Sequence, residues 1–304
     1  MSARDLMDDQ WPYDSPSRRR GRAVRRLAEA TVRSGSLRPG ILPAYWWDGH
    51  PNFGDALTPW ILSRYGIAAV HTPPRDARAA GVGSIIEQLP PTFSGAIWGS
   101  GLMHGEPVEL PKATALAVRG PLTRAALGIT HDVALGDPGI LVARHAMRQS
   151  ARWRLGLVPH GLHSRDGVLA DLATRAGSDA TIIDVRAVPG AVIQRIARCS
   201  AILTTSLHGL IVADALGVPA VWTRRQPDLW GGDFKFRDYE AVMTPGRTRE
   251  ITLTADTSLR DLELGASGPE ASAREESIRR LEETIPHLPT TPDRPWRAVV
   301  RRRE

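Results

Sequence analysis

The chain contains little cysteine and no long apolar run. Its 304 residues include a single cysteine, Cys199, which excludes an internal disulfide framework and a cysteine-based zinc site. No apolar stretch approaches the roughly 20 residues that span a bilayer, and no hydrophobic segment follows the early arginines as a secretory signal would require. The fractions of hydrophobic residues, 42%, and charged residues, 24%, are those of a globular protein. We therefore expect a cytoplasmic protein.

The positive charge of the chain is concentrated near its two ends. Residues 1–40 and 294–304 each carry a net charge of +4, so the formal +6 leaves residues 41–293 at about −2. This slightly negative net charge of residues 41–293 does not indicate a nucleic-acid partner. The aromatic and glycine pattern of an RNA-binding module is also missing. Residues 18–27 have the pattern of a basic amphipathic helix that contacts an anionic membrane surface; a solvated, partly disordered tail is the alternative.

Between these tails, short apolar runs alternate with helical patterns, which predicts a parallel α/β architecture. In the first half we expect strands at 44–47, 81–85, 96–98, 115–118 and 133–135, and helices at 56–65 and 121–127. In the second half we expect strands at 155–159, 181–185, 201–205 and 220–222, and helices at 167–175, 191–197 and 209–216. The polar stretch 144–152 is interpreted as a linker.

This organisation predicts two similar α/β domains between two basic tails. The predicted segments are an N-terminal tail at 1–40, domains at 41–150 and 151–293, and a C-terminal tail at 294–304. Two such halves imply a cleft between them, and sheets of this kind bind ligands at the carboxyl ends of their strands.

The first candidate site is the turn of residues 52–55, where Asn52, Gly54 and Asp55 separate a strand from a helix. Free backbone N–H groups and the positive end of the helix dipole at such a turn favour an anion. The structural alternative is that Asp55 caps the helix while Gly54 relaxes the turn.

Other candidates lie at later junctions between strands and turns. Gly99 and Ser100 are small residues that let a ligand approach the backbone. Arg119 stands at the carboxyl end of a strand directly before a helix, which suits an anion. Asp137 lies in an Asp-Pro-Gly turn, for which a purely structural role is equally compatible.

The junction that indicates a functional site most clearly spans residues 203–219. There an apolar strand leads to Ser206 and His208 at the start of an apolar helix, and Gly209 permits a close backbone approach. A lone histidine is usually structural, but one at a strand-to-helix junction is well placed for acid–base chemistry.

The ordered set of these motifs resembles the polysaccharide pyruvyl transferase family, and within it the exopolysaccharide ketal-pyruvate transferase branch. The resemblance covers roughly residues 44–225 and rests on the motifs NFGD (52–55), GVGSI (81–85), WGSG (98–101), RGPLT (119–123), GDP (136–138), PH (159–160) and SLHG (206–209). It implies two Rossmann-like domains facing across a cleft, similar to the B-type glycosyltransferase fold. It also implies transfer of pyruvate from phosphoenolpyruvate to a sugar of a lipid-linked or polymeric glycan, with neither a metal nor a separate cofactor.

The resemblance also implies roles for the candidate residues. His208 and Asp55 would be the acid and the base in one assignment or the other, and Arg119 would bind an anionic group of phosphoenolpyruvate. The remaining residues implied to bind substrate are Asn52, Gly99, Ser100, Asp137 and Ser206.

One departure from the family concerns Ser206. Many relatives carry arginine at this position, two residues before the histidine, so the donor would depend more on Arg119 or on another arginine such as Arg224 or Arg225. Two other functions remain open, because a fold does not fix a function. They are a glycosyltransferase that uses a sugar nucleotide and a non-catalytic glycan-binding protein.

Overall fold

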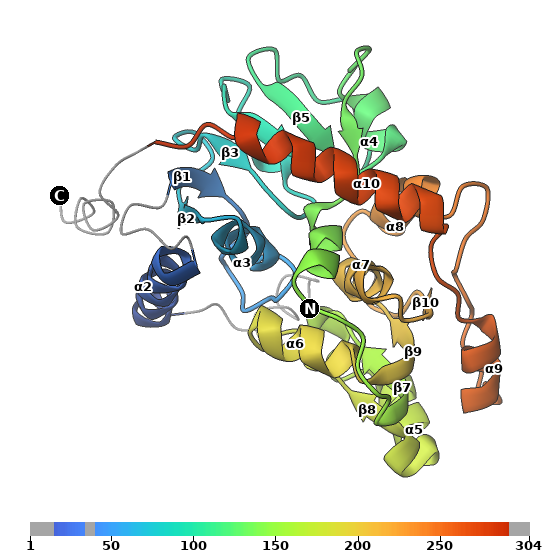
Figure 1. Cartoon of the computed structure of the whole chain (residues 1–304). Helices are drawn as coiled ribbons and strands as arrows, with labels where there is room; N and C mark the ends of the chain where they lie inside the picture. Colours follow the sequence, from blue (N-terminus) through green and yellow to red (C-terminus); the bar gives the residue numbers. More distant parts are fainter. Residues whose placement is uncertain (1–14, 34–39, 292–304) are drawn as a thin grey trace. The chain divides into compact units, whose positions relative to one another are not determined.

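The structure is a computed structural model that describes residues 15–33 and 40–291 (Figure 1). The described residues divide into two compact units: unit 1 comprises residues 50–54 and 139–276, and unit 2 comprises residues 15–33, 40–49, 55–138 and 277–291. Each unit contains one sheet whose paired strands all run parallel, so the predicted α/β class is confirmed. The predicted domain boundaries stay predictions, and the predicted tail at 294–304 lies outside the described residues.

Unit 2 is built on the larger sheet. Its strands are β1 (Gly40–Tyr45), β2 (Ile67–His71), β3 (Ala79–Ala80), β4 (Ala96–Trp98), β5 (Thr114–Val118) and β6 (Ala134–Leu135). Its helices are α2 (Pro16–Arg33), α3 (Leu57–Arg64) and α4 (Pro121–Ala126). The strand order is β2-β1-β3-β4-β5-β6, so successive connections leave β1 toward opposite edges of the sheet. In doubly wound sheets, ligands bind at this kind of switch point. In this sheet the switch point lies between β1 and β3.

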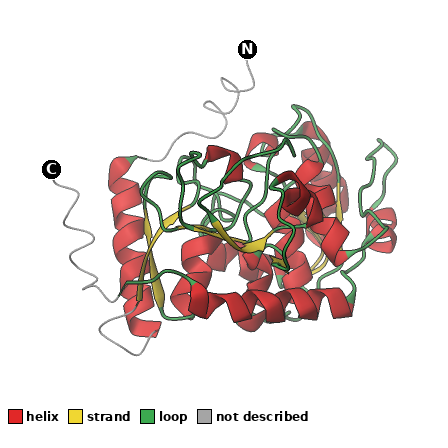
Figure 2. Cartoon of the chain, turned by 90° about the horizontal axis from the view of Figure 1, so that it is seen from above, coloured by secondary structure: helices red, strands yellow, loops and turns green. Residues whose placement is uncertain are grey.

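Unit 1 has a smaller sheet with the same kind of switch point. Its strands are β7 (Trp153–Val158), β8 (Ala180–Ile182), β9 (Cys199–Thr204) and β10 (Ala220–Trp222), in the order β10-β9-β7-β8. Its helices are α5 (Gly167–Ala176), α6 (Pro189–Ile196), α7 (Leu207–Leu216), α8 (Phe234–Met243) and α9 (Leu259–Gly265), and α10 (Ala271–Thr284) begins in it. Figure 2 colours the strands of the chain yellow and shows helices, in red, beside them. The switch point of this sheet lies between β7 and β9.

Local sequence explains several boundaries. Pro121 opens α4, where its missing N–H costs nothing, and Gly128 follows the helix in the left-handed conformation with a φ of 63°. α3 buries Leu57 and Ile61 as predicted, but Ala56 occupies its N-cap position and no side chain caps it. The structural alternative, in which Asp55 caps this helix, is therefore not observed.

The predicted strand at 81–85 is wrong, because β3 ends at Ala80. Gly83 has a φ of 118°, a conformation that side-chain-bearing residues rarely adopt and that a strand cannot contain. The GVGSI motif therefore forms the loop after the strand. This places it at the carboxyl edge of the sheet, where the candidate site lies.

The helix α2 settles one open question about the basic N-terminal segment. Residues 16–33 are helical, Leu27 is buried against Ala68, and Arg22 forms an ion pair with Asp48 at 3.0 Å. This part of the predicted tail is thus packed structure in unit 2. Among the described helices, none is long and apolar enough to cross a membrane.

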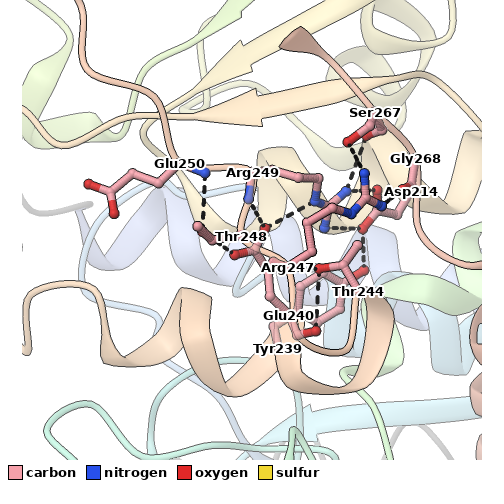
Figure 3. Close-up of polar contacts among 10 residues, drawn as sticks. All are labelled: Asp214, Tyr239, Glu240, Thr244, Arg247, Thr248, Arg249, Glu250, Ser267 and Gly268. Atoms are coloured by element: carbon pink, nitrogen blue, oxygen red, sulfur yellow. Dashed lines mark hydrogen bonds and ion pairs between the residues drawn. The ribbon is translucent and has the colours of Figure 1, made fainter.

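A buried ion-pair network holds α7 in unit 1 (Figure 3). The guanidinium of Arg249 donates to both carboxylate oxygens of Asp214 on α7, at 2.5 and 3.0 Å, and to Glu240 on α8 at 3.0 Å. The hydroxyl of Tyr239 donates to Asp214 at 2.9 Å, and all four residues are buried. Because His208 lies in the first turn of α7, this network fixes the helix that carries a predicted site residue.

Candidate functional site

The candidate residues lie at the carboxyl ends of the two sheets. Unit 2 contains Asp55, Gly99, Ser100, Arg119 and Asp137. Unit 1 contains Asn52, Ser206 and His208. The structure thus brings together the members of each set within its own unit, and the two sets are described separately below.

In unit 2, Asp55 lies at the switch point between β1 and β3. Its carboxylate packs against Gly83, where an added Cβ would lie 3.0 Å from Asp55 Oδ1. Asp55 is 8% exposed, so it retains little contact with solvent. Burial, and then the negative charge of Asp55, raises the pKa of Tyr45 at the end of β1 to about 12. The carboxylate therefore stands at the position where a sheet of this order binds ligands.

Arg119 connects three neighbouring loops of unit 2. It follows β5, and its guanidinium donates to Ser84 Oγ at 2.6 Å, after β3, and to the carbonyl of Leu102 at 2.7 Å, after β4. An added Cβ at Gly101 would overlap the guanidinium, and Arg119 is fully buried. Arg119 therefore holds the loops at the carboxyl edge together, a contribution that the sequence did not reveal.

The two small residues after β4 are explained by close packing. Gly99 has a φ of 72°, and an added Cβ would overlap Pro138 and approach the carbonyl of Gly136. The hydroxyl of Ser100 donates to the carbonyl of Gly81. Asp137, which lies between Gly136 and Pro138 in the sequence, is fully buried. The structure thus gives Gly99 and Ser100 structural roles at the loop edge, and their predicted contact with substrate stays a prediction.

In unit 1, the turn that begins the NFGD motif packs against His208. The amide of Phe53 donates to the carbonyl of Val185 at 2.8 Å, and Asn52 Oδ1 accepts from the amide of Gly54 at 3.1 Å. The Phe53 ring meets the imidazole of His208 edge-on at 6.5 Å, and an added Cβ at Gly54 would overlap that imidazole. The glycine of this turn is therefore required for close approach to the histidine.

His208 itself is set by the junction that the sequence predicted. β9 ends at Thr204, Ser206 occupies the N-cap position of α7, and His208 is 8% exposed. An added Cβ at Gly209 would overlap Thr204 Oγ1, so only glycine lets the helix start so close to the strand. The N-terminus of α7 and the side chain of His208 thus lie together at the carboxyl edge of the sheet.

Two further histidines follow β7, on the other side of the same switch point. His163 Nε2 donates to the carbonyl of Pro227 at 2.9 Å, so its Nδ1 accepts from the Thr205 hydroxyl at 2.9 Å. Burial is the main cause that lowers the pKa of His163. The pKa of His160 lies well below its ordinary value, first because of burial and then because of the charges of Lys235 and the neighbouring histidines.

Sequence reasoning missed part of this histidine cluster, which comprises His50, His160, His163 and His208. His160 appeared only within the Pro159-His160 motif, and that motif was the available signal for it. No sequence signal pointed to His50, His163 or Lys235. Among the described residues, no group of three or more His, Cys, Asp or Glu side chains is arranged to hold a metal ion.

A hollow of about 280 Å³ in unit 2 lies away from these residues. It is lined at the amino ends of β3, β4 and β5 by residues that include Arg78, Ala96, Thr114 and His287. Ligands of parallel sheets bind at the opposite, carboxyl ends of the strands. We therefore assign the candidate site to the carboxyl edges and not to this hollow.

Comparisons with known proteins agree with the motifs. Residues 110–227 match the polysaccharide pyruvyl transferase family. The chain is 30% identical over 210 residues to the succinoglycan biosynthesis protein ExoV of Rhizobium meliloti (strain 1021), a match that covers 66% of this chain and 64% of that protein. It is also 30% identical over 136 residues to an uncharacterized protein of Acanthamoeba polyphaga mimivirus, covering 41% of this chain and 46% of that protein.

The chain thus spans less than two thirds of the length of each of these relatives. The family match contains the junctions of Arg119, Asp137, Ser206 and His208. The resemblance predicted from the motifs is confirmed by this match of residues 110–227 to the polysaccharide pyruvyl transferase family.

Proposed function

We propose that the protein transfers pyruvate from phosphoenolpyruvate to a sugar of a cell-surface glycan and forms a pyruvate ketal. The observation that carries this proposal is the position of His208, nearly buried at the switch point of a sheet, within the segment that matches the family. The name of one relative, a succinoglycan biosynthesis protein, supports a glycan as the acceptor. The proposed exopolysaccharide branch and a lipid-linked acceptor rest on the motif resemblance.

The proposed reaction has two steps. In the first, a sugar hydroxyl adds to C2 of the enol, C3 takes up a proton and becomes a methyl group, and the hydroxyl proton passes to a base. In the second, a neighbouring hydroxyl of the sugar bonds to C2 and releases its proton to the departing phosphate, while the bond from C2 to the phosphate oxygen breaks. Phosphate leaves with the electron pair, and the cyclic ketal remains. The sequence of steps needs one proton donor and one proton acceptor, and no redox change.

The structure supports assigning these roles to His208 and Asp55, each from its own surroundings. His208 carries an imidazole, the side chain most often used in general acid–base catalysis, which suits a donor of the proton to C3. Asp55 has a carboxylate at the switch point of its own sheet, which suits a base or a group that orients the acceptor hydroxyl. The reverse assignment remains the alternative.

For Arg119 the structure supports a second role beside the predicted one. Its buried hydrogen bonds to Ser84 and Leu102 hold the loops after β3, β4 and β5 in one arrangement. We propose that Arg119 contributes to donor binding, and that part of its effect passes through these loops.

A reaction with defined substrates tests the proposed function. The purified protein is incubated with phosphoenolpyruvate and a set of lipid-linked or polymeric glycans, and phosphate release and the mass of the acceptor are measured together. We expect equal amounts of phosphate and of an acceptor heavier by one pyruvate less one water. A glycosyltransferase would instead consume a sugar nucleotide, and a binding protein would retain the glycan without releasing phosphate. Either result contradicts the proposal.

A further inference from the structure

Trp230 in unit 1 differs from the other tryptophans that the structure describes. The chain has nine tryptophans, of which Trp11 and Trp296 lie outside the described residues. Each of the others except Trp230 takes part in a hydrogen bond, a ring contact or an electrostatic interaction. Trp230 has no such contact with another described residue, and it is 49% exposed. Its indole ring is therefore accessible to a ligand.

A single exposed apolar side chain needs no explanation by itself, so the position of Trp230 matters. The amide of Gly232 donates to the carbonyl of Leu229 at 2.9 Å and closes a turn whose two central residues are Trp230 and Gly231. Gly231 and Gly232 have φ values of 71° and 57°, which side-chain-bearing residues rarely adopt. Trp230 is thus held in a defined turn. A rigid aromatic side chain on such a turn loses little conformational entropy when it binds.

The loop that carries this turn is bonded to the candidate site. Residues 223–233 follow β10 at the carboxyl edge of the unit 1 sheet. The carbonyl of Pro227 accepts from His163 Nε2 at 2.9 Å, and Nδ1 of the same ring accepts from the Thr205 hydroxyl at 2.9 Å. Thr205 lies two residues before α7, the helix whose second residue is His208. Hydrogen bonds therefore connect the loop to the junction that carries His208.

The turn itself lies against the same edge. A cavity of about 20 Å³ is lined by its first and last residues, Leu229 and Gly232, and by His163 among others. Phe236 of α8 stacks on Trp222 of β10 with a centroid distance of 4.4 Å, which fixes both ends of the loop. An added Cβ at Gly232 would meet nothing within 4 Å, so the space beside the turn is open.

The charges of the loop favour a neutral ligand over an anion. Its two arginines, Arg224 and Arg225, form ion pairs through Nε with carboxylates elsewhere in unit 1, at 2.6 and 2.9 Å. Asp228, two residues before Trp230, accepts from the side-chain amide of Gln226 at 3.0 Å and forms no ion pair with another described residue. The loop thus combines paired cations with a carboxylate that accepts hydrogen bonds, which suits a ligand rich in hydroxyl groups.

A sugar ring has the chemistry that matches an accessible indole near a carboxylate. The C–H groups on one face of a pyranose carry a small positive charge, which is attracted to the negative face of an aromatic ring. The contact also removes apolar surface from water. The hydroxyl groups at the edge of the ring are donors, and carboxylate oxygens accept from them.

We propose that Trp230 forms a subsite for a neutral sugar ring of the acceptor glycan. The indole stacks on the C–H face of the sugar, and Asp228 accepts hydrogen bonds from its hydroxyl groups. The proposal rests on the proposed function, because it takes a glycan as the acceptor. Both residues follow the segment 110–227 that matches the family, so the subsite lies outside that match.

Acceptor kinetics test the proposal. The probe is the water-soluble glycan that gains pyruvate in the assay of the proposed function. The proteins compared are the wild type, Trp230→Ala, Trp230→Phe and, as the matched control, Leu264→Ala, because Leu264 is an apolar residue of unit 1 that is 75% exposed. We expect the KM for the glycan to rise about tenfold in Trp230→Ala, the usual scale for an aromatic contact. Trp230→Phe keeps an aromatic face and should restore most of this loss, and Leu264→Ala should match the wild type.

Two further measurements separate a sugar contact from a structural defect. The KM for phosphoenolpyruvate and the kcat should stay close to the wild-type values in Trp230→Ala, because a structural defect would lower the active fraction and hence kcat. Asp228→Ala should also raise the KM for the glycan and leave the KM for phosphoenolpyruvate unchanged. Calorimetric titration with the glycan alone should show the same order of affinities as the kinetics.

The outcomes separate the two proposals. A wild type that releases no phosphate with any glycan overturns the proposed function. A wild type that is active, together with a folded Trp230→Ala whose KM for the glycan is unchanged, overturns the subsite and leaves the function standing. A changed oligomeric state of Trp230→Ala with an unchanged KM for the glycan assigns Trp230 to a protein contact and also overturns the subsite. Thermal unfolding is measured for every variant, and if Trp230→Ala does not fold, Trp230→Gln replaces it in the same comparison.

Discussion

At the scale of single residues, His208 carries the proposed chemistry most directly. We expect His208→Ala to lower kcat about 100-fold or more, the usual contribution of a general acid or base. The imidazole also packs against Phe53 and Gly54, so a modest loss of stability will accompany the change. Turnover is measured as phosphate release from phosphoenolpyruvate, with His287→Ala as the control because His287 is exposed in the other unit. Near-normal turnover in a folded His208→Ala protein would remove His208 from the chemistry.

Arg119 allows direct binding and loop positioning to be separated. Arg119→Lys keeps the charge but loses the planar fork, so we expect weaker binding of phosphoenolpyruvate in calorimetry even for this mild change. Ser84→Ala leaves the arginine in place and removes the hydrogen bond of 2.6 Å to the loop after β3. If Ser84→Ala weakens binding as much as Arg119→Lys does, loop positioning explains the effect. Unchanged affinity in both Arg119→Lys and Arg119→Ala would move the anion site away from Arg119.

At the scale of the element, the stability of α7 depends on the network around Arg249. We expect Arg249→Met to lower the free energy of unfolding by about 3–5 kcal/mol, because the carboxylates of Asp214 and Glu240 then stay buried without their cation. Urea unfolding measures the change. Arg247→Met is the matched control: Arg247 is exposed and bonds Ser267 and Gly268, so its loss should cost less than about 1 kcal/mol.

One outcome of this unfolding experiment would contradict the stabilising role of the network. If Arg249→Met unfolds at the same urea concentration as the wild type, the ion pairs do not stabilise α7. The replacement of a whole buried ion-pair network by apolar residues is often neutral, so the single substitution, and not the removal of all partners, is the informative experiment.

At the scale of the whole molecule, the exposed face of α2 is the surface proposed to contact an anionic membrane. Arg18, Arg20 and Arg25 are exposed there, and Val24 and Val32 are 44% and 80% exposed. Arg19 and Arg22 instead contact the loop of residues 48–49. Each exposed arginine near an anionic surface contributes about 1 kcal/mol, so three arginines support reversible binding.

The packing of α2 also determines which variant is informative. Deleting residues 1–40 would remove β1's first residue and expose Ala68, which Leu27 covers, so a loss of binding would have two explanations. Replacing Arg18, Arg20 and Arg25 by Gln leaves this contact intact. We expect the triple variant to lose co-sedimentation with vesicles that contain anionic lipid, and to keep its activity on a water-soluble acceptor. The wild type should lose the same binding in 1 M salt, where the Debye length is about 3 Å. Sedimentation of the variant equal to that of the wild type would contradict the proposal.

Several elements follow from the sequence alone because their signals are local. Strands β4 and β10 coincide with their predictions at 96–98 and 220–222, and Pro121 and Gly128 delimit α4 as expected. Apolar runs, proline and glycine act within a few residues, so they can be interpreted without knowing the fold. The junction of Ser206 and His208 was found for the same reason. The charged helices α8, α9 and α10 were not predicted, because the apolar periodicity of their sequences is weak.

Tertiary structure alone decided which distant groups meet. Asp214 and Arg249 are 35 residues apart in the chain. The residues around each of them contain no pattern that predicts their bidentate ion pair. Gly83 could be assigned to a loop only from its positive φ, and the packing of α8 on β10 became known only from the stacking of Phe236 on Trp222. The physical reason is that local propensity sets each strand and helix, whereas long-range packing sets the strand order and thereby the switch points where the site residues gather.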